Sequence, residues 1–131
     1  MKSLTTFWAA LAAAFFLIVP ATAAAPGWTS YEPRQFATAQ QAGRTILVDV
    51  HANWCPTCRA QKPTLNKLRS DPRLKDVLFV TVNFDKQKDF LRSHRIPRQS
   101  TILVFKGTKE TARSIAETNP ARLSAAILAG V

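Results

Sequence analysis

Apolar residues recur along the chain at two spacings, one typical of buried strands and the other typical of helices. Three short runs rich in apolar and β-branched residues predict strands that are covered on both faces: residues 45–50, 77–84 and 101–105. Apolar residues at helical spacing predict four helices: residues 33–42, residues 56–69, residues 85–94 and a last helix from residue 120. Residues 110–117 predict an edge strand antiparallel to the strand before it. This order predicts an α/β domain with a mixed central sheet of about four strands, flanked by helices on both faces.

The N-terminal segment has the pattern of a secretory signal peptide. Lys2 supplies a positive charge, residues 7–19 form an uninterrupted apolar run, and Ala21 and Ala23 stand in the small-residue positions of a cleavage site. The apolar run is shorter than the about 20 residues that span a bilayer, which favours cleavage over an uncleaved membrane anchor. We therefore predict that residues 1–23 are a cleaved Sec-type signal peptide and that the protein is periplasmic, with a membrane anchor as the alternative.

The remainder of the chain has the size of one domain. Pro26, Gly27 and Pro33 punctuate its start, so we predict a linker or irregular arm at residues 24–32 and a single domain at residues 33–131. The whole chain carries a net charge of +10. In a cytosolic protein this charge would suggest a nucleic-acid partner, but an exported protein meets little nucleic acid. Because the basic residues are scattered, we interpret the charge as a contribution to solubility and expect no nucleic-acid partner.

Both cysteines lie in one short motif, Trp54-Cys55-Pro56-Thr57-Cys58, between the first predicted strand and the helix that follows it. With Cys58 in the first turn of that helix, Cys55 stands at the helix N-terminus, where the helix dipole lowers the pKa of a thiol. Two thiols at this spacing can cycle between dithiol and disulfide, and the thiolate is the nucleophile that starts each exchange. The motif therefore predicts redox chemistry.

Three other interpretations of the two cysteines are open. A ring this short constrains the unfolded chain little, so a purely structural disulfide would stabilise the fold only weakly. A zinc site usually has four ligands, of which the motif supplies half, and His51 and His94 are the only histidines in the chain. Two inert free thiols would be unusual in an oxidising compartment. Metal binding is thus the main alternative to redox chemistry.

Asp49 interrupts an apolar strand, where a carboxylate is costly to bury unless it is paired or protonated. Side chains alternate along a strand, so Leu47, Asp49 and His51 share one face, and this face leads to the cysteines. Asp49 could instead be a structural acid, and His51 an ordinary core or surface histidine. Because perturbed groups gather at functional sites, we favour a functional role for Asp49, and for His51 we favour the structural one.

Residues 46–63 (ILVDVHANWCPTCRAQKP) resemble the thioredoxin family: a strand with an aspartate, a tryptophan directly before CxxC, and a proline in the following helix. Residues 82–85 and 102–107 are similar to the family's next two strands, and the resemblance extends from residue 33 to the C-terminus. It implies the thioredoxin fold, with Cys55 as the attacking nucleophile, Cys58 as the resolving thiol and Asp49 as the buried acid that handles the proton of Cys58. It also implies a set of motif and substrate-groove residues: Trp54, Pro56, Thr57, His51, Gln99, Ser100 and Thr101.

The chain departs from the family pattern around these residues. Ser100 stands where the family has a cis-proline opposite the cysteines, and since a non-proline cis bond costs about 2.5 to 4 kcal/mol, we expect a trans peptide before Ser100. His51 stands where members often have tryptophan, and a protonated imidazole there could lower the pKa of a thiol or assist Asp49 in proton transfer. Thr81 replaces the lysine that frequently partners the buried acid, and Pro-Thr replaces Gly-Pro between the cysteines.

These residues predict an exported thiol:disulfide oxidoreductase that exchanges disulfides with protein substrates, mainly as a reductant. Because no third cysteine exists, we expect a membrane-bound redox partner to recycle the pair. No flavin, haem or nicotinamide signature is present, so we expect no bound cofactor. We also expect the protein to be a monomer. The alternative is a periplasmic copper or zinc carrier that uses Cys55, Cys58 and His51. A third, weaker alternative is an interaction protein with vestigial cysteines.

Overall fold

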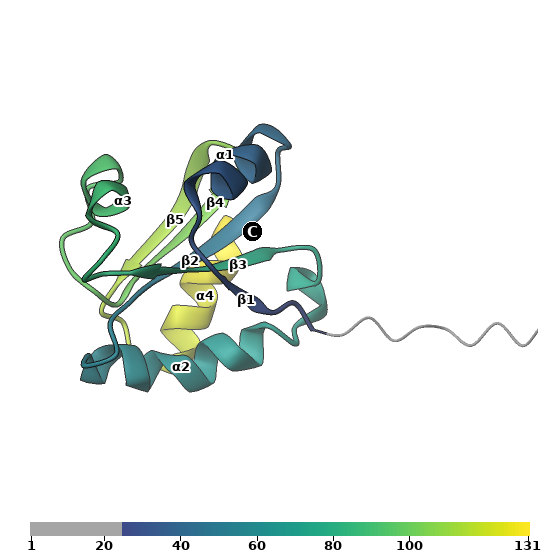
Figure 1. The fold of residues 1–131 in the computed structure, drawn as a ribbon. Helices are drawn as coiled ribbons and strands as arrows, with labels where there is room; N and C mark the ends of the chain where they lie inside the picture. Colours follow the sequence, from purple (N-terminus) through teal and green to yellow (C-terminus); the bar gives the residue numbers. More distant parts are fainter. Residues whose placement is uncertain (1–24) are drawn as a thin grey trace, which may run out of the picture.

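The computed structural model describes residues 25–131, and the predicted signal peptide lies outside the described residues. A mixed five-stranded sheet forms its centre, in the order β1-β3-β2-β4-β5 (Figure 1). The strands are β1 (Trp28–Ser30), β2 (Thr45–His51), β3 (Leu78–Asn83), β4 (Thr101–Lys106) and β5 (Lys109–Ile115). The helices are α1 (Pro33–Gln41), α2 (Pro56–Leu68), α3 (Lys88–Ser93) and α4 (Pro120–Gly130), with a short 3-10 turn at Pro72–Leu74. The prediction of an α/β fold with a mixed sheet is confirmed.

Strand β2 is central and sets the register of the sheet. It pairs in parallel with β3, which places Asp49 beside Thr81, and antiparallel with β4, which places Asp49 beside Ile102. Strand β5 then pairs antiparallel with β4, as predicted. Since β2 has a neighbouring strand on each side, its backbone N–H and C=O groups are hydrogen-bonded along its length. The side chains on its two faces determine how the helices pack against it.

Helices cover both faces of the sheet (Figure 1). Helices α1 and α3 cover one face, where Phe36 and Phe90 pack with the even-numbered residues of β2. Helices α2 and α4 cover the other face, where Leu65 and Leu123 pack with Leu47. Because side chains alternate along β2, Asp49 and His51 also point to the α2 and α4 side. The face predicted to lead to the cysteines is therefore the one that α2 covers.

The segment predicted as an irregular arm, residues 24–32, contains a strand. Trp28–Ser30 pairs in parallel with β3, Thr29 Oγ1 donates a hydrogen bond to the carbonyl of Phe79 over 3.0 Å, and the Trp28 ring meets the Phe79 ring edge-on at 5.1 Å. The prediction was wrong here because a strand of 3 residues is too short to show alternation, and proline and glycine directly before it are typical of loops. The sheet has one more strand than predicted for this reason.

Helix α2 carries the cysteine motif and continues through Pro63. Its buried face consists of residues at helical spacing: Cys58, Gln61, Thr64, Leu65 and Leu68. Ala60 is exposed, whereas its neighbour Gln61 is fully buried. Within residues 25–131, none of the helices combines the length and the apolar character needed to cross a bilayer.

Candidate active site

Cys55 is the N-cap residue of α2, with extended backbone angles of φ −84° and ψ 112°, and Pro56 occupies the first helical position. Cys55 Sγ accepts a hydrogen bond from the backbone N–H of Cys58 over 3.1 Å, in the manner of a capping side chain. Both residues are free thiols, with exposed fractions of 0% for Cys55 and 2% for Cys58. The amide and the helix dipole both favour a negative charge on Cys55 Sγ.

Ser100 lies in the turn before β4 and brings its hydroxyl to both thiols. Ser100 Oγ is 3.1 Å from Cys55 Sγ and 3.1 Å from Cys58 Sγ. Its side chain is buried, and its backbone φ of +62° lies in the left-handed region. The described residues contain no cis peptide bond, so the peptide before Ser100 is trans, as predicted. The position opposite the cysteines therefore carries a hydrogen-bonding group.

The two thiols have pKa shifts in opposite directions. Burial raises the pKa of the Cys55 thiol, but hydrogen bonds with Cys58, Ser100 and Gln99 outweigh it, and the pKa falls below its usual value. Burial also raises the pKa of the Cys58 thiol and the neighbouring Cys55 raises it further, whereas the hydrogen bond with Ser100 opposes both effects. The pKa shifts therefore favour the negative charge on Cys55 and the proton on Cys58.

Asp49 is a buried carboxylic acid on the face of β2 that α2 covers, with 4% of its surface exposed. Burial raises the pKa of Asp49 from 3.8 to about 6, although the Lys62 ammonium on α2 acts in the opposite direction. Among the described residues, Asp49 Oδ1 has no hydrogen-bond partner. An acid with this pKa is mostly ionised at neutral pH and can accept a proton, which is the role that a resolving thiol requires.

His51 Nδ1 lies 3.8 Å from Asp49 Oδ2. Burial lowers the pKa of His51, Lys62 lowers it further, and a hydrogen bond with Asn53 opposes both effects. His51 is therefore neutral at neutral pH, so its contact with Asp49 is not an ion pair under these conditions. The half-buried Thr81 lies beside Asp49 in the sheet, as the resemblance implied, and the positive charge near Asp49 comes from Lys62 instead.

Trp54 forms part of the exposed surface next to the motif. It is 56% exposed, and its indole Nε1 donates a hydrogen bond to Asp85 Oδ2 over 3.0 Å. Pro56 is exposed and Thr57 is half-buried. These three motif residues are thus at least partly accessible to a substrate, whereas Cys55 and Cys58 are buried.

Of the remaining predicted groove residues, Gln99 is half-buried and helps to lower the pKa of the Cys55 thiol. Thr101 is buried, and its Oγ1 donates a hydrogen bond to the carbonyl of Arg98 over 2.8 Å. Thr101 therefore stabilises the turn before β4, and its hydroxyl is directed to the backbone.

Gln61 is a site residue that sequence reasoning missed. Its Nε2 donates hydrogen bonds to the carbonyl of Ser100 over 3.3 Å and to the carbonyl of Glu117 over 3.0 Å. It thereby connects α2 to the turn that carries Ser100. The signal was present in the helical periodicity, because residues three, four and seven positions after Gln61 are all buried on the same face of α2.

The metal-carrier alternative requires His51 to join Cys55 and Cys58 around one ion. Among residues 25–131, no three or more histidine, cysteine, aspartate or glutamate side chains are grouped so that they could hold a metal ion. The geometry instead brings His51 to Asp49. The described residues therefore do not fit the proposed metal ligand set.

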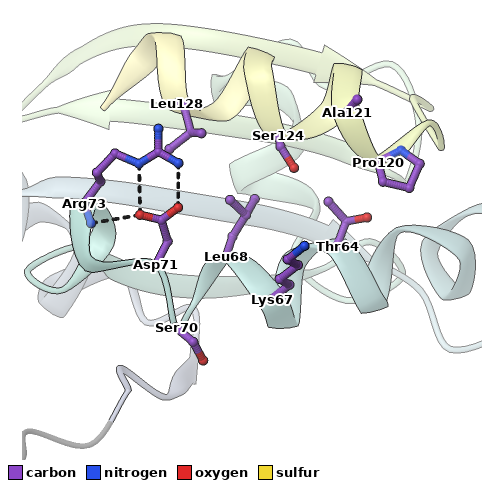
Figure 2. A pocket seen from close by; sticks show the side chains of 10 residues that line it. All are labelled: Thr64, Lys67, Leu68, Ser70, Asp71, Arg73, Pro120, Ala121, Ser124 and Leu128. Atoms are coloured by element: carbon purple, nitrogen blue, oxygen red, sulfur yellow. Dashed lines mark hydrogen bonds and ion pairs between the residues drawn. The ribbon is translucent and has the colours of Figure 1, made fainter.

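A pocket of about 650 Å³ lies away from the predicted site, between the C-terminal half of α2 and α4 (Figure 2). Leu68 and Leu128 form apolar parts of its wall, and an ion pair between Arg73 and Asp71, 2.7 Å long, borders it (Figure 2). Its lining includes none of the predicted site residues. The chemistry of the cysteines is thus separate from this pocket.

Comparisons with known proteins agree with this geometry. The family model described as Thioredoxin matches residues 29–129. Thioredoxin-1 of Saccharomyces cerevisiae is 28% identical over 95 residues, which are 72% of this chain and 89% of that protein. A thioredoxin-like protein of Fusarium culmorum is 35% identical over 68 residues, and the match spans 56% of its length and 51% of this chain. The crystal structure of Trxlp from Edwardsiella tarda is similar with a TM-score of 0.73 and 39% identity, over 77% of this chain and 98% of that chain.

Proposed function

The chain belongs to the thioredoxin family, whose members are thiol:disulfide oxidoreductases, and from this premise we propose that it reduces disulfides of other proteins outside the cytoplasm. The observation that carries the proposal is the position of Cys55 Sγ at the N-terminus of α2, where it accepts the N–H of Cys58. A thiol held there loses its proton more readily than the thiol of a free cysteine, and the resulting thiolate is the species that attacks a disulfide.

The reaction proceeds in two exchanges. Cys55 thiolate attacks one sulfur of the substrate disulfide, a Cys55–substrate bond forms, and the substrate bond breaks with its electron pair on the second substrate sulfur, which takes a proton from water. Cys58 then loses its proton to the Asp49 carboxylate and attacks Cys55 Sγ. The Cys55–Cys58 disulfide forms, and the first substrate sulfur leaves as a thiolate. Two electrons pass from the chain to the substrate.

The hydrogen bonds around Cys55 support the reductive direction. A strong disulfide donor is one whose dithiol form is strongly stabilised. The groups that lower the pKa of Cys55 are neutral hydrogen-bond donors, and burial opposes them. Because the groups that lower the pKa of Cys55 include no cationic side chain, we expect its thiolate to be stabilised less than that of a strong disulfide donor, which favours electron transfer to a substrate disulfide.

The need for recycling supports a separate redox partner. The chain has 2 cysteines, and both form the reacting pair, so the oxidised protein cannot be reduced by a thiol of its own. The proposed protein is a monomer that its N-terminal signal pattern directs to the periplasm. A membrane-bound electron donor that faces the periplasm would therefore be able to reduce its disulfide.

Redox equilibration with glutathione tests the proposed direction, with thiol alkylation as the readout. We expect a reduction potential near about −270 mV, the value of a reductant, and a value near about −120 mV would overturn the proposal. Cys55→Ser should abolish reduction of a protein disulfide. Cys58→Ser should instead accumulate the mixed disulfide with the substrate.

Export is tested separately by expressing the full chain in a host with a periplasm. We expect a periplasmic protein whose measured mass corresponds to a start after Ala23. Recovery of the uncleaved chain in the membrane fraction would instead favour the anchor.

A further inference from the structure

The hydroxyl of Ser100 is positioned as a hydrogen-bonding bridge between the two reacting sulfurs. It is fully buried, and its two hydrogen-bond partners in the described part of the chain are Cys55 Sγ and Cys58 Sγ, each at 3.1 Å. A hydroxyl has one hydrogen to donate and lone pairs to accept with. Ser100 can therefore donate to one sulfur while it accepts the thiol hydrogen of the other.

The backbone holds this hydroxyl in place. The N–H of Ser100 donates to the carbonyl of Val50 over 2.8 Å, and the carbonyl of Ser100 accepts the N–H of Ala116 over 3.0 Å and the Nε2 of Gln61 over 3.3 Å. A non-glycine residue at φ +62° persists only where its surroundings determine its conformation. These three bonds come from β2, from the segment after β5 and from α2, so Ser100 is fixed relative to both cysteines.

We propose that Ser100 is a catalytic residue whose hydroxyl donates its hydrogen to the Cys55 thiolate before substrate attack and to the Cys58 thiolate after it. This proposal rests on the proposed function, because it concerns the same two exchanges. The family pattern has a proline at this position, and a proline side chain has no hydrogen to donate. The Ser100 hydroxyl therefore adds a hydrogen-bond donor that the family pattern lacks.

Between the two states, the Ser100 hydroxyl changes only the direction in which it donates its hydrogen. In the reduced protein with Cys55 ionised, Cys58 S–H donates to Ser100 Oγ, and Ser100 O–H donates to the Cys55 thiolate. Once Cys55 Sγ is bonded to a substrate sulfur, it carries no charge and accepts hydrogen bonds weakly. As Asp49 takes the proton of Cys58, the Ser100 hydroxyl turns to the new Cys58 thiolate, which then attacks Cys55 Sγ and displaces the substrate thiolate. The hydroxyl keeps its own proton throughout.

Two substitutions remove the hydroxyl in different backbone contexts. Ser100→Ala keeps a side chain at the left-handed position, whereas Ser100→Gly removes the hydroxyl and also relieves the backbone strain. The Thr64→Val variant is a matched control, because Thr64 is a buried hydroxyl residue on the same helix as Cys58 and has no hydrogen bond to either sulfur in the described structure. Near-ultraviolet circular dichroism establishes that each variant is folded before measurement.

The first measurement is a titration of Cys55 in the reduced full chain, followed by thiolate absorbance and by the rate of alkylation. A hydrogen bond to a charged group shifts a pKa by about one to two units, so we expect both Ser100 variants to raise the pKa of Cys55 by at least about one unit. Alkylation at a fixed pH below the pKa should slow by about tenfold per unit, whereas Thr64→Val should leave both values unchanged. An unchanged pKa in both Ser100 variants would overturn the proposal.

The second measurement follows resolution of a mixed disulfide between Cys55 and thionitrobenzoate, whose release is coloured. We expect release by Cys58 to be slower by about tenfold in both Ser100 variants, and a rate equal to that of Thr64→Val would overturn the transfer of the hydrogen bond to Cys58. Both measurements use the isolated protein and need no protein substrate or recycling partner. Their failure is therefore distinguishable from failure of the proposed reductive function, which the reduction potential tests.

Discussion

Replacing Asp49 by asparagine removes a buried charge and keeps the size of the side chain. Asp49 is 4% exposed, and its Oδ1 has no hydrogen-bond partner among the described residues. An asparagine amide would also be buried, so the cost of burying a polar group is common to both proteins. The difference between them is the cost of burying the negative charge, which the exposed Lys62 ammonium reduces but does not cancel.

The magnitude follows from the pKa of Asp49, which burial raises from 3.8 to about 6. Because the pKa is higher in the folded state, the folded protein binds the proton more tightly than the unfolded chain does. The penalty is absent below about pH 4, grows as the pH rises, and is complete above about pH 6. A shift of about two units corresponds to about 3 kcal/mol of unfolding free energy. At alkaline pH, the free energy of unfolding of the Asp49→Asn variant should exceed that of the wild type by this amount.

Urea unfolding in the presence of a thiol reductant measures the effect, because it holds both cysteines in the reduced state. At about pH 8 the Asp49→Asn variant should be more stable than the wild type by about 3 kcal/mol, and near pH 4 the gain should fall below about 1 kcal/mol. Asp76→Asn makes the same chemical change at an exposed position and should have little effect at either pH. A gain that is the same at both pH values would refute the reasoning, because it could not come from the buried charge.

Three further changes test the surroundings of the site and the fold. Lys62→Met should raise the pKa of both Asp49 and His51 in an NMR titration, because the Lys62 ammonium lowers both, and a shift in only one of them would contradict this. Gln61→Leu removes a donor from two backbone carbonyls and should lower the free energy of unfolding by about 1 to 3 kcal/mol in urea, so a variant of unchanged stability would argue against the bridge. Gly130→Ala should cost about 1 to 3 kcal/mol by the same assay, because a Cβ would lie 2.6 Å from a side-chain carbon of β5, and an unchanged midpoint would show that α4 can move away.

The strands of the sheet were predictable because their composition reflects burial on both faces. The runs that became β2, β3 and β4 are apolar at successive positions, as strands between two layers of helices must be. The same reasoning singled out Asp49, since a charged residue in such a run needs a reason to be buried. The spacing of Cys55 and Cys58 predicted the capping position of Cys55 because both features depend on local chain geometry alone.

Features that depend on contacts between distant segments were not predictable in this way. Ser100 is 45 positions from Cys55 in the chain; the resemblance placed it opposite the cysteines, but nothing in residues 96–100 indicated that its hydroxyl meets both sulfurs. The role of Lys62 depends on how α2 lies on the sheet, so the sequence showed the loss of a lysine at Thr81 but not the charge near Asp49. The third helix began later than predicted, at Lys88, because Asn83 Oδ1 accepts two amides of the turn before it.

Cys55 and Cys58 depend on different neighbouring groups, so the two steps of the proposed reaction should respond differently to pH. Neutral hydrogen bonds lower the pKa of Cys55, whereas in the proposed mechanism proton transfer from Cys58 depends on the charge state of Asp49, whose pKa is about 6. As the pH falls through about 6, Asp49 takes up a proton and the resolving step loses its acceptor. Over the same range the folded state becomes more stable, because the buried charge disappears. Resolution and stability should therefore change in opposite directions between about pH 8 and about pH 5, and the Asp49→Asn variant, which has no acceptor at any pH, should be both more stable and slower at the alkaline end.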